Sequence, residues 1–255
     1  NTEKLLEQEV AADIEAVEEA KPSRWRTLAT TPILITLLFL LVLIVAFSIL
    51  APGKFGTTSN LTLLAQNVAI LTVVSVGTTF VIATAGIDLS IPSGIILGEV
   101  FAAQMLSKIS APGGGTAFDV QSAATTATYT LAALAAALVG GLLIGAINGV
   151  LVGYMRIPPM LATLGTLGAG LGVALLIRKG VNVATYALNP VTNGHVIPGV
   201  TNLVVIALLV VVLGYIGLHY SVFGRHTLAI GSSEEAARRV GLKVERHLLK
   251  VYIVG

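Results

Sequence analysis

The chain has 255 residues, of which 55% are hydrophobic and 11% are charged, and its net charge is +2. Soluble globular domains have about a quarter charged residues, so fifteen basic and thirteen acidic side chains are too few to cover this chain in water. The mean hydropathy of +0.90 therefore excludes a soluble protein and predicts an all-α, polytopic bundle of transmembrane helices. The absence of cysteine excludes disulfides and thiolate metal sites, and the four histidines have no metal-ligand spacing.

Residues 1–30 are predicted to form a cytoplasmic extension. Seven acids lie within residues 1–20, where Leu6, Val10, Ile14 and Val17 recur at helical spacing. Two interpretations are open, namely a solvated and partly disordered tail that ends near Pro22 and an amphipathic helix that touches a cytoplasmic partner. The acidic start differs from a signal peptide, so the first apolar run is interpreted as a retained anchor.

A membrane-spanning helix needs about 20 predominantly apolar residues, and such stretches define a bundle over residues 31–222. The third stretch is short and polar at its start, and the fourth is long enough that it must tilt, kink or protrude. Residues 251–255 are apolar again and are predicted to begin a seventh crossing in a chain that ends as if truncated. The six stretches are residues 32–50, 61–83, 90–106, 125–154, 160–177 and 202–220.

The distribution of lysine and arginine predicts that the N-terminus lies inside. With this orientation, eleven basic residues fall in inside segments and four fall in outside segments. Residues 223–250 are then cytoplasmic. The four outside residues are Lys54, Lys108, Arg178 and Lys179.

The sequence TAGIDLSIPSG, Thr84–Gly94, predicts a break between the second and third crossings. Gly86 can end one helix, and Asp88 or Ser90 can cap the next, whose first turn tolerates Pro92. Irregular backbone at membrane depth survives only against protein or water, and an acid there is a hypothesis for a transport pathway. Asp88 therefore either lines a pathway or only caps a helix at the cytoplasmic rim.

Four glycines in the fourth crossing repeat every four residues and therefore share one helix face. Such a face allows a neighbouring helix to approach closely. Asn148 lies beside this strip and either bonds to a neighbouring helix or lines a pathway. The glycines of the strip are Gly141, Gly145, Gly149 and Gly153.

Polar residues within the crossings are candidates for lining a translocation pathway. Glu99 either faces a cavity or pairs with a neighbouring helix. The candidates are Asp88, Ser90, Asn67, Glu99 and Asn148.

The cytoplasmic segment Phe223–Tyr252 predicts one short helix over residues 232–240. Ser232 and Glu235 have the spacing of a capping box, and Gly241 supplies a C-terminal stop. Acids at the start (Glu234 and Glu235) and arginines at the end (Arg238 and Arg239) match the helix dipole.

Ala236 and Ala237, in the middle of this helix, are small enough to lie in a groove of another protein. A capped helix between two crossings therefore favours a docking element over an ordinary connector.

Three blocks in this order closely resemble the permease subunits of bacterial monosaccharide ABC importers, the ribose, xylose, galactose and autoinducer-2 group. The blocks are GIDLS, then GLLIGAINGVLVGYMRIPPMLATLGT, then FGRHTLAIGSSEEAARRVGLKVERHLLKVY, and the resemblance covers residues 60–255. It implies that the third block is the coupling loop that contacts the ATP-binding subunit. The residues implied in this coupling are Gly231, Ser232, Glu234, Glu235, Ala236, Ala237, Arg238 and Gly241.

The resemblance implies a multi-pass protein of the bacterial plasma (inner) membrane that imports a monosaccharide or a similar small polar solute. It implies no catalytic residues, metal or cofactor in this chain, because ATP would be bound by a partner, and no Walker-type GxxxxGK[ST] occurs in the sequence. The implied partners are ATP-binding cassette ATPase subunits, an extracytoplasmic sugar-binding protein, a second permease copy in a homodimer, and membrane lipid. No nucleic acid partner is expected.

Three other functions remain open. A branched-chain amino acid ABC permease is a near relative. An ion-gradient-driven secondary transporter would use Asp88 or Glu99 as its ion site, although such folds tend to have paired broken helices and only one break is visible. A membrane scaffold would use the glycine strip and the cytoplasmic helix for assembly alone.

Overall fold

The computed structural model describes residues 32–110, 127–179 and 189–255, and within these residues every regular element is an α-helix. The all-α prediction is therefore confirmed for the described part of the chain. The predictions for the N-terminal extension lie outside the described residues. The chain divides into two units, residues 1–61 and 62–255.

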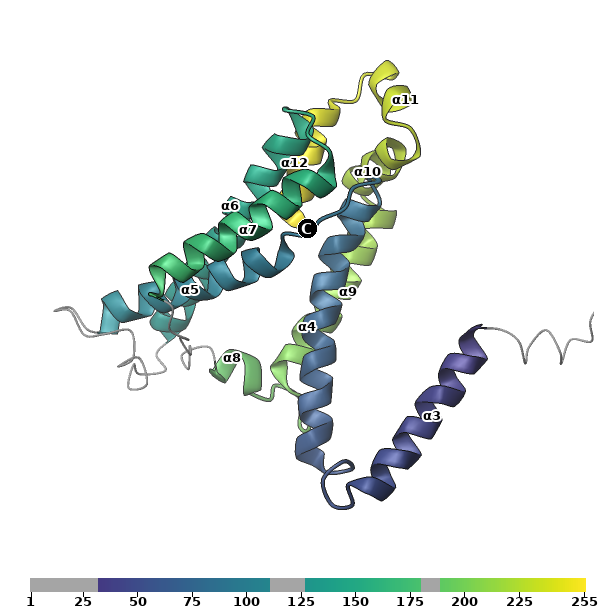
Figure 1. The fold of residues 1–255 in the computed structure, drawn as a ribbon, viewed down its shortest axis with the longest axis vertical. Coiled ribbons are helices and arrows are strands. Elements are labelled where there is room, and N and C mark those ends of the chain that lie inside the picture. The colour runs from purple at the N-terminus through teal and green to yellow at the C-terminus, as the bar shows by residue number, and fades with distance from the viewer. Residues whose placement is uncertain (1–31, 111–126, 180–188) are drawn as a thin grey trace, which may run out of the picture. The chain divides into compact units, whose positions relative to one another are not determined.

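The helices follow the order of the predicted crossings, and five of them are long and apolar enough to span a membrane. These five are α3, α4, α6, α7 and α9, while α5 contains a shorter apolar stretch, Ile91–Leu106. The protein is thus a multi-pass membrane protein, whereas the count of six crossings and the side of the N-terminus stay predictions. The helices (Figure 1) are α3 (Pro32–Leu50), α4 (Thr58–Ile82), α5 (Ile91–Ser110), α6 (Ala127–Gly153), α7 (Pro159–Ile177), α8 (Asn189–Asn193), α9 (Asn202–His219), α10 (Val222–Ser232), α11 (Glu234–Arg239) and α12 (Val244–Val254).

In the first unit, α3 exposes apolar side chains on all its faces. A helix that is hydrophobic all round is typical of a membrane span. Its last turn packs Phe47 against Phe55, with ring centroids 5.7 Å apart. The turn that follows is closed by Asn60, whose amide donates to the carbonyl of Phe55 at 2.7 Å.

In the second unit, α5, α6 and α7 pack together through small residues. A Cβ atom on Gly140 of α6 would lie 2.6 Å from the Cα of Gly98 on α5, and one on Gly170 of α7 would lie 2.8 Å from the Cβ of Ser93. Close approach of this kind supplies van der Waals contact where lipid provides no hydrophobic driving force. The buried core beside these contacts is formed by Leu97, Val100, Ile144 and Ala174.

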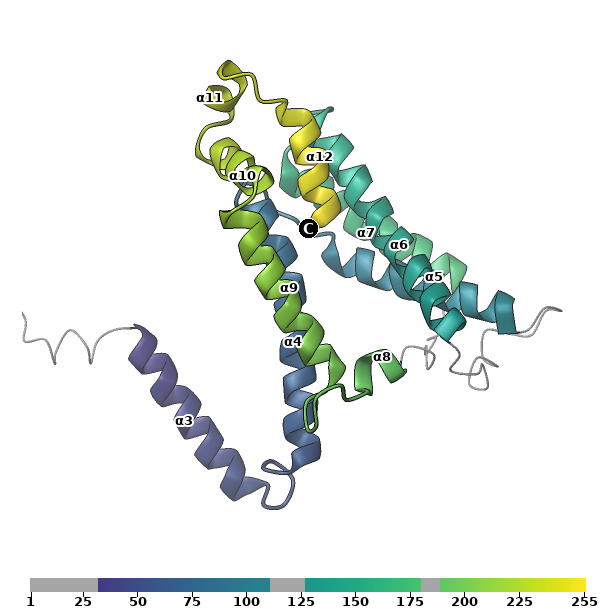
Figure 2. The same cartoon turned by 180° about the vertical axis from the view of Figure 1, so that it is seen from behind.

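The neighbour of the predicted glycine strip is α12, which lies along α6 (Figure 1 and Figure 2). A Cβ on Gly145 would lie 2.3 Å from the carbonyl oxygen of Tyr252, and one on Gly153 would lie 2.9 Å from that of Glu245. Gly149 is equally close to Leu249, at 2.7 Å from its Cα. The packing prediction is therefore confirmed for three of the four glycines.

Gly141 has nothing within 4 Å of its Cβ position among the described residues, so close packing at this glycine stays a prediction. The helix α12 runs continuously from Val244 to Val254 across the predicted boundary between residues 250 and 251, and a seventh crossing that begins there stays a prediction. The inner face of α12, which includes Val244, Leu248 and Val251, is buried over this whole length.

Candidate functional site

The short helix α11 is defined by its two caps. Ser233 has extended backbone, with φ −162° and ψ 107°, and its side chain accepts a hydrogen bond from the amide of Ala236 at 3.2 Å. At the other end, Gly241 has φ +86°, which favours glycine, and its amide donates to the carbonyl of Arg238 at 3.0 Å. The amide of Leu242 donates to the carbonyl of Ala237 at 3.1 Å, which completes a Schellman motif.

The capping residue predicted from the sequence was the wrong serine. Ser232 is the last residue of α10, and the helix that follows it covers Glu234–Arg239 rather than residues 232–240. Two adjacent serines precede the acids, and α10 continues through the first because its inner face, with Thr227 and Ile230, is buried. The predicted stop at Gly241 is confirmed.

The two alanines of α11 face opposite environments. Ala237 is 3% exposed and packs with Ile230, Val244 and Leu248 of the same chain, so the expectation that it lies in a partner's groove is wrong. Ala236 is exposed. The outer surface of α11 also includes Val240, which is 78% exposed. The exposure of Val240 could not be predicted from the sequence, because an apolar residue at a helix end is equally typical of a core.

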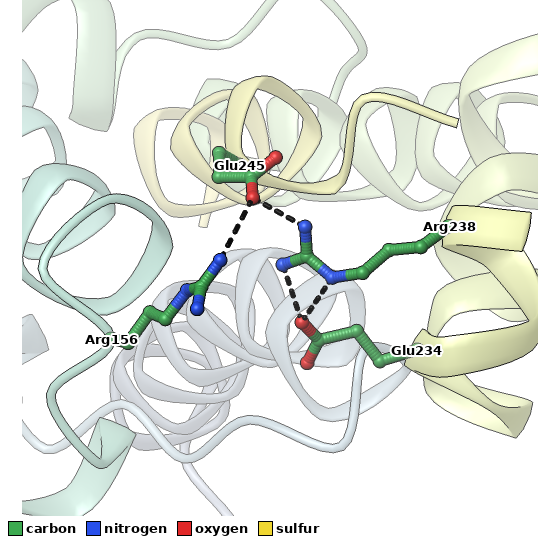
Figure 3. A network of polar contacts seen from close by, with 4 residues as sticks. All are labelled: Arg156, Glu234, Arg238 and Glu245. Carbon is green, nitrogen blue, oxygen red and sulfur yellow. Dashed lines mark hydrogen bonds and ion pairs between the residues drawn. The ribbon is translucent and has the colours of Figure 1, made fainter. Parts of the chain in front are cut away.

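Four charged residues join α11 to the rest of the unit (Figure 3). Arg238 donates to Glu234 within α11 at 2.7 Å, and it also pairs with Glu245 at the start of α12. Glu245 in turn lies 3.9 Å from Arg156, in the turn between α6 and α7. Figure 3 shows Glu245 between the two guanidinium groups. Neither Arg156 nor Glu245 was among the predicted site residues, because their pairing joins segments far apart in the sequence.

This network shifts the pKa values of Glu245 and Arg238. Hydrogen bonding from Arg238 holds the pKa of Glu245 below its ordinary value. Hydrogen bonds to Glu245 and Glu234 likewise raise the pKa of Arg238. A separate pair on the exposed side, Arg239 with Glu235 at 2.5 Å, stays within α11.

The end of α10 touches the predicted helix break directly. A Cβ on Gly231 would lie 2.0 Å from the carbonyl oxygen of Ala83, which follows the last residue of α4. The chain turns at Ala85, whose φ is +59°, and Gly86 closes the turn by donating to the carbonyl of Val81 at 3.1 Å. The predicted break is confirmed. Because Gly231 has no side chain, the backbone of α10 can contact the backbone at this break directly.

Asp88 organises the start of α5. Its carboxylate accepts hydrogen bonds from the amide of Ser90 at 2.7 Å and from the hydroxyl of Ser90 at 2.6 Å. The residue also lines a cavity of about 380 Å³ bordered by α5, α6 and α12, together with Ser90 and Glu99. The structure thus shows a local structural role for Asp88, while a role in a pathway stays a prediction.

The other candidates for a pathway are dispersed. Asn148 is fully buried, donates to the hydroxyl of Ser90 at 2.6 Å and accepts from the hydroxyl of Thr166 at 2.7 Å, so it joins α5, α6 and α7. Glu99 is exposed and lines the cavity, and within the described part of the chain it has no ion pair. Asn67 is exposed toward the opposite end of α4 from the break.

Residues 60–255 match the protein family described as branched-chain amino acid transport system / permease component. Three of the curated relatives show the extent of the similarity. The fructose import permease protein FrcC of Rhizobium meliloti is 30% identical over 89% of this chain and 61% of its own length. The ribose import permease protein RbsC of Escherichia coli K12 is 31% identical, over 85% and 63%. The D-allose transport system permease protein AlsC of the same organism is 30% identical, over 85% and 62%.

The chain thus spans about three fifths of the length of these relatives. No solved structure matches it.

Proposed function

Because the chain belongs to the family described as branched-chain amino acid transport system / permease component, we propose that it is the membrane-spanning subunit of an ATP-binding-cassette importer. The proposed cargo is a monosaccharide or a similar small polar solute, since the relatives are named for fructose, ribose and allose. ATP is bound and hydrolysed by separate ATPase subunits. An extracytoplasmic sugar-binding protein delivers the solute, and two permease copies form a homodimer in the bacterial inner membrane.

The observation that carries this proposal is the way in which α11 is held. Its inner side is fixed by Ala237 in the core and by the pairing of Arg238 with Glu245. Its outer side presents Ala236 and Val240 beside the exposed ion pair of Glu235 with Arg239. A helix that is anchored on one side and exposed on the other is suited to dock on a partner and pass on its movement.

The contacts around α11 define the route of that movement. A displacement of α11 reaches α12 through Glu245, and it reaches the break between α4 and α5 through Gly231 and Ala83. Asp88 and Ser90 lie a few residues beyond this contact and border the cavity. ATP-driven closure of the ATPase subunits would therefore shift the start of α5 as a nearly rigid unit.

The test is uptake by proteoliposomes that contain the full-length protein, its ATPase subunits and its binding protein. We expect ATP-dependent uptake of labelled ribose, fructose or allose, and no uptake with a non-hydrolysable ATP analogue. Uptake of leucine without sugar would instead identify a branched-chain amino acid importer. Uptake driven by an ion gradient without ATP would identify a secondary transporter, and no uptake of any solute would favour a scaffold.

The docking role of α11 is tested by Ala236→Trp, which places a bulky side chain on its exposed surface. Ala65→Trp, at an exposed alanine near the opposite end of α4, is the matched control. We expect uptake to fall at least tenfold in the first variant and less than twofold in the second, with both proteins folded. Equal uptake in the two variants would show that α11 does not dock on the ATPase.

A further inference from the structure

A hollow of about 370 Å³ between α10 and α12 has a strongly basic lining. His226, Lys243, Arg246 and Lys250 line it, and no lining residue is acidic. Within the described part of the chain, no ion pair joins Lys243, Arg246 or Lys250 to an acid. The one acid of α12, Glu245, pairs with Arg238 and Arg156 instead.

The basic residues are gathered on one face of α12. Lys243, Arg246 and Lys250 follow one another at intervals of three and four residues, so they lie on the same side of the helix. Glu245, Leu249 and Tyr252 form the side that packs on the glycine strip of α6. Like charges at this spacing repel one another, and an anion in the hollow would relieve that repulsion.

The depth of the hollow is set by the pairing of α12 with α6. Glu245 lies beside Gly153, Leu249 beside Gly149 and Tyr252 beside Gly145. At a rise of about 1.5 Å per residue, Lys250 lies roughly 7 Å further along α12 than Glu245. A lysine at this depth near a helix end extends its ammonium group toward the headgroup region.

An apolar cavity of about 720 Å³ adjoins the basic hollow, and Lys250 lines both. Its other walls include Val76 and Phe80 of α4, Leu213 of α9 and Ile253 of α12. A basic hollow beside apolar walls at the cytoplasmic ends of membrane helices has the chemistry of a site for an anionic lipid headgroup.

We propose that this hollow binds the phosphate of an anionic phospholipid from the cytoplasmic leaflet. The basic residues bind the phosphate oxygens. Because α12 lies between the hollow and α6, the bound lipid also stabilises the position of α12. The proposal uses the predicted orientation of the chain and does not depend on which solute is carried.

The test compares two triple variants of the full-length protein by native mass spectrometry after release from detergent. Lys243→Gln/Arg246→Gln/Lys250→Gln removes the basic lining, and Lys54→Gln/Lys179→Gln/Arg225→Gln removes the same charge at positions outside the hollow. We expect wild type and control to retain about one phosphatidylglycerol per chain, with affinities within about twofold of each other. The hollow variant should bind at least tenfold more weakly, and phosphatidylcholine should bind weakly to all three proteins.

Further measurements distinguish lipid binding from binding of other anions and from an effect of misfolding. Lys250→Arg keeps the charge and should retain phosphatidylglycerol, whereas Lys250→Gln should lose part of it. Inorganic phosphate at millimolar concentration should not displace the lipid, and full displacement would show a site for free phosphate. Equal lipid retention in both triple variants, or a loss confined to binding of the ATPase, would overturn the proposal.

Discussion

At the scale of single residues, Asn148 is the polar centre of the region where α5, α6 and α7 meet. Its amide donates to Ser90, and its carbonyl accepts from Thr166. Both bonds are buried, and the serine also donates to Asp88. Asn148 therefore fixes the start of α5 relative to α6 and α7 and indirectly orients the acid at the cavity.

We expect Asn148→Ala to destabilise the protein by about 1–2 kcal/mol, because hydrogen bonds between membrane helices contribute about 0.6 kcal/mol each on average and the shorter side chain leaves a void. The measurement is unfolding of the purified protein in detergent. Ser75→Ala is the control, because among the described residues the Ser75 hydroxyl bonds to the carbonyl of Leu71 in its own helix and to no other helix. Equal losses in the two variants would contradict the bridging role of Asn148.

The lowered pKa of Glu245 makes the attachment of α11 dependent on pH. Because Arg238 lowers this pKa in the folded protein, folding is favoured most at pH values above the ordinary glutamate pKa of about 4.3. As the pH falls through the lowered pKa, the carboxylate takes up a proton and the pair with Arg238 is lost.

Hydrogen exchange of the α11 amides, corrected for intrinsic rates, should therefore be constant above about pH 5 and faster at lower pH. We expect a two- to fivefold increase, since partly exposed ion pairs contribute up to about 1 kcal/mol. Arg238→Gln should exchange faster at neutral pH and show a smaller dependence on pH. A wild-type profile that matches this variant would show that the pair does not hold α11.

At the scale of elements, the glycine strip of α6 offers a test within one helix face. Gly149→Ala places a methyl group 2.7 Å from the Cα of Leu249, so either α12 must move or the contact is strained. Overpacking of this kind costs about 1–3 kcal/mol. Gly141→Ala meets nothing within 4 Å and gains helix propensity of up to about 1 kcal/mol.

We therefore expect the thermal midpoint in detergent to fall for Gly149→Ala and to stay equal or rise for Gly141→Ala. Both substitutions add the same methyl group to the same face of α6, so a difference between their thermal midpoints shows the effect of α12 packed against Gly149. If the two midpoints shifted alike, α12 would not pack on the strip at Gly149.

The elements that could be predicted from the sequence are those with local signals. The run at residues 125–154 predicts α6 within a few residues of Ala127–Gly153, and the break at Asp88 follows from Gly86 and Pro92. The partner of the glycine strip could not be predicted, because small residues show that a helix approaches but not which one. The same limit hid Thr166 and Glu245, whose partners are distant in the sequence.

The short helix α11 shows a second limit. Its existence, its C-terminal stop and its charge pattern follow from local rules, but the orientation of two neighbouring alanines depends on tertiary packing. Ala237 faces the core because Ile230 and Leu248 approach from α10 and α12, and this leaves Ala236 outside. A helix of six residues is too short for a hydrophobic pattern to show which face is buried.

At the scale of the whole chain, the contacts of the second unit agree with alternating crossings. The end of α4 touches Gly231 through Ala83, and the end of α6 touches the start of α12 through Gly153 and Glu245. Gln66, near the other end of α4, bonds to Asn193 of α8 at 2.7 Å. The contacts within the second unit therefore gather the helix ends in two sets, and the distribution of lysine and arginine predicts that the set with α11 is cytoplasmic.

This orientation can be tested by introducing single cysteines, because the sequence contains none of its own. We expect a membrane-impermeant maleimide added to intact cells to label Lys54→Cys and His195→Cys, and to label Ser232→Cys and Val240→Cys only after the cells are opened. All four positions are exposed, so differences in labelling report the side of the membrane. Labelling of Ser232→Cys from outside would place α11 away from cytoplasmic ATP, and an ATPase could then not dock on it.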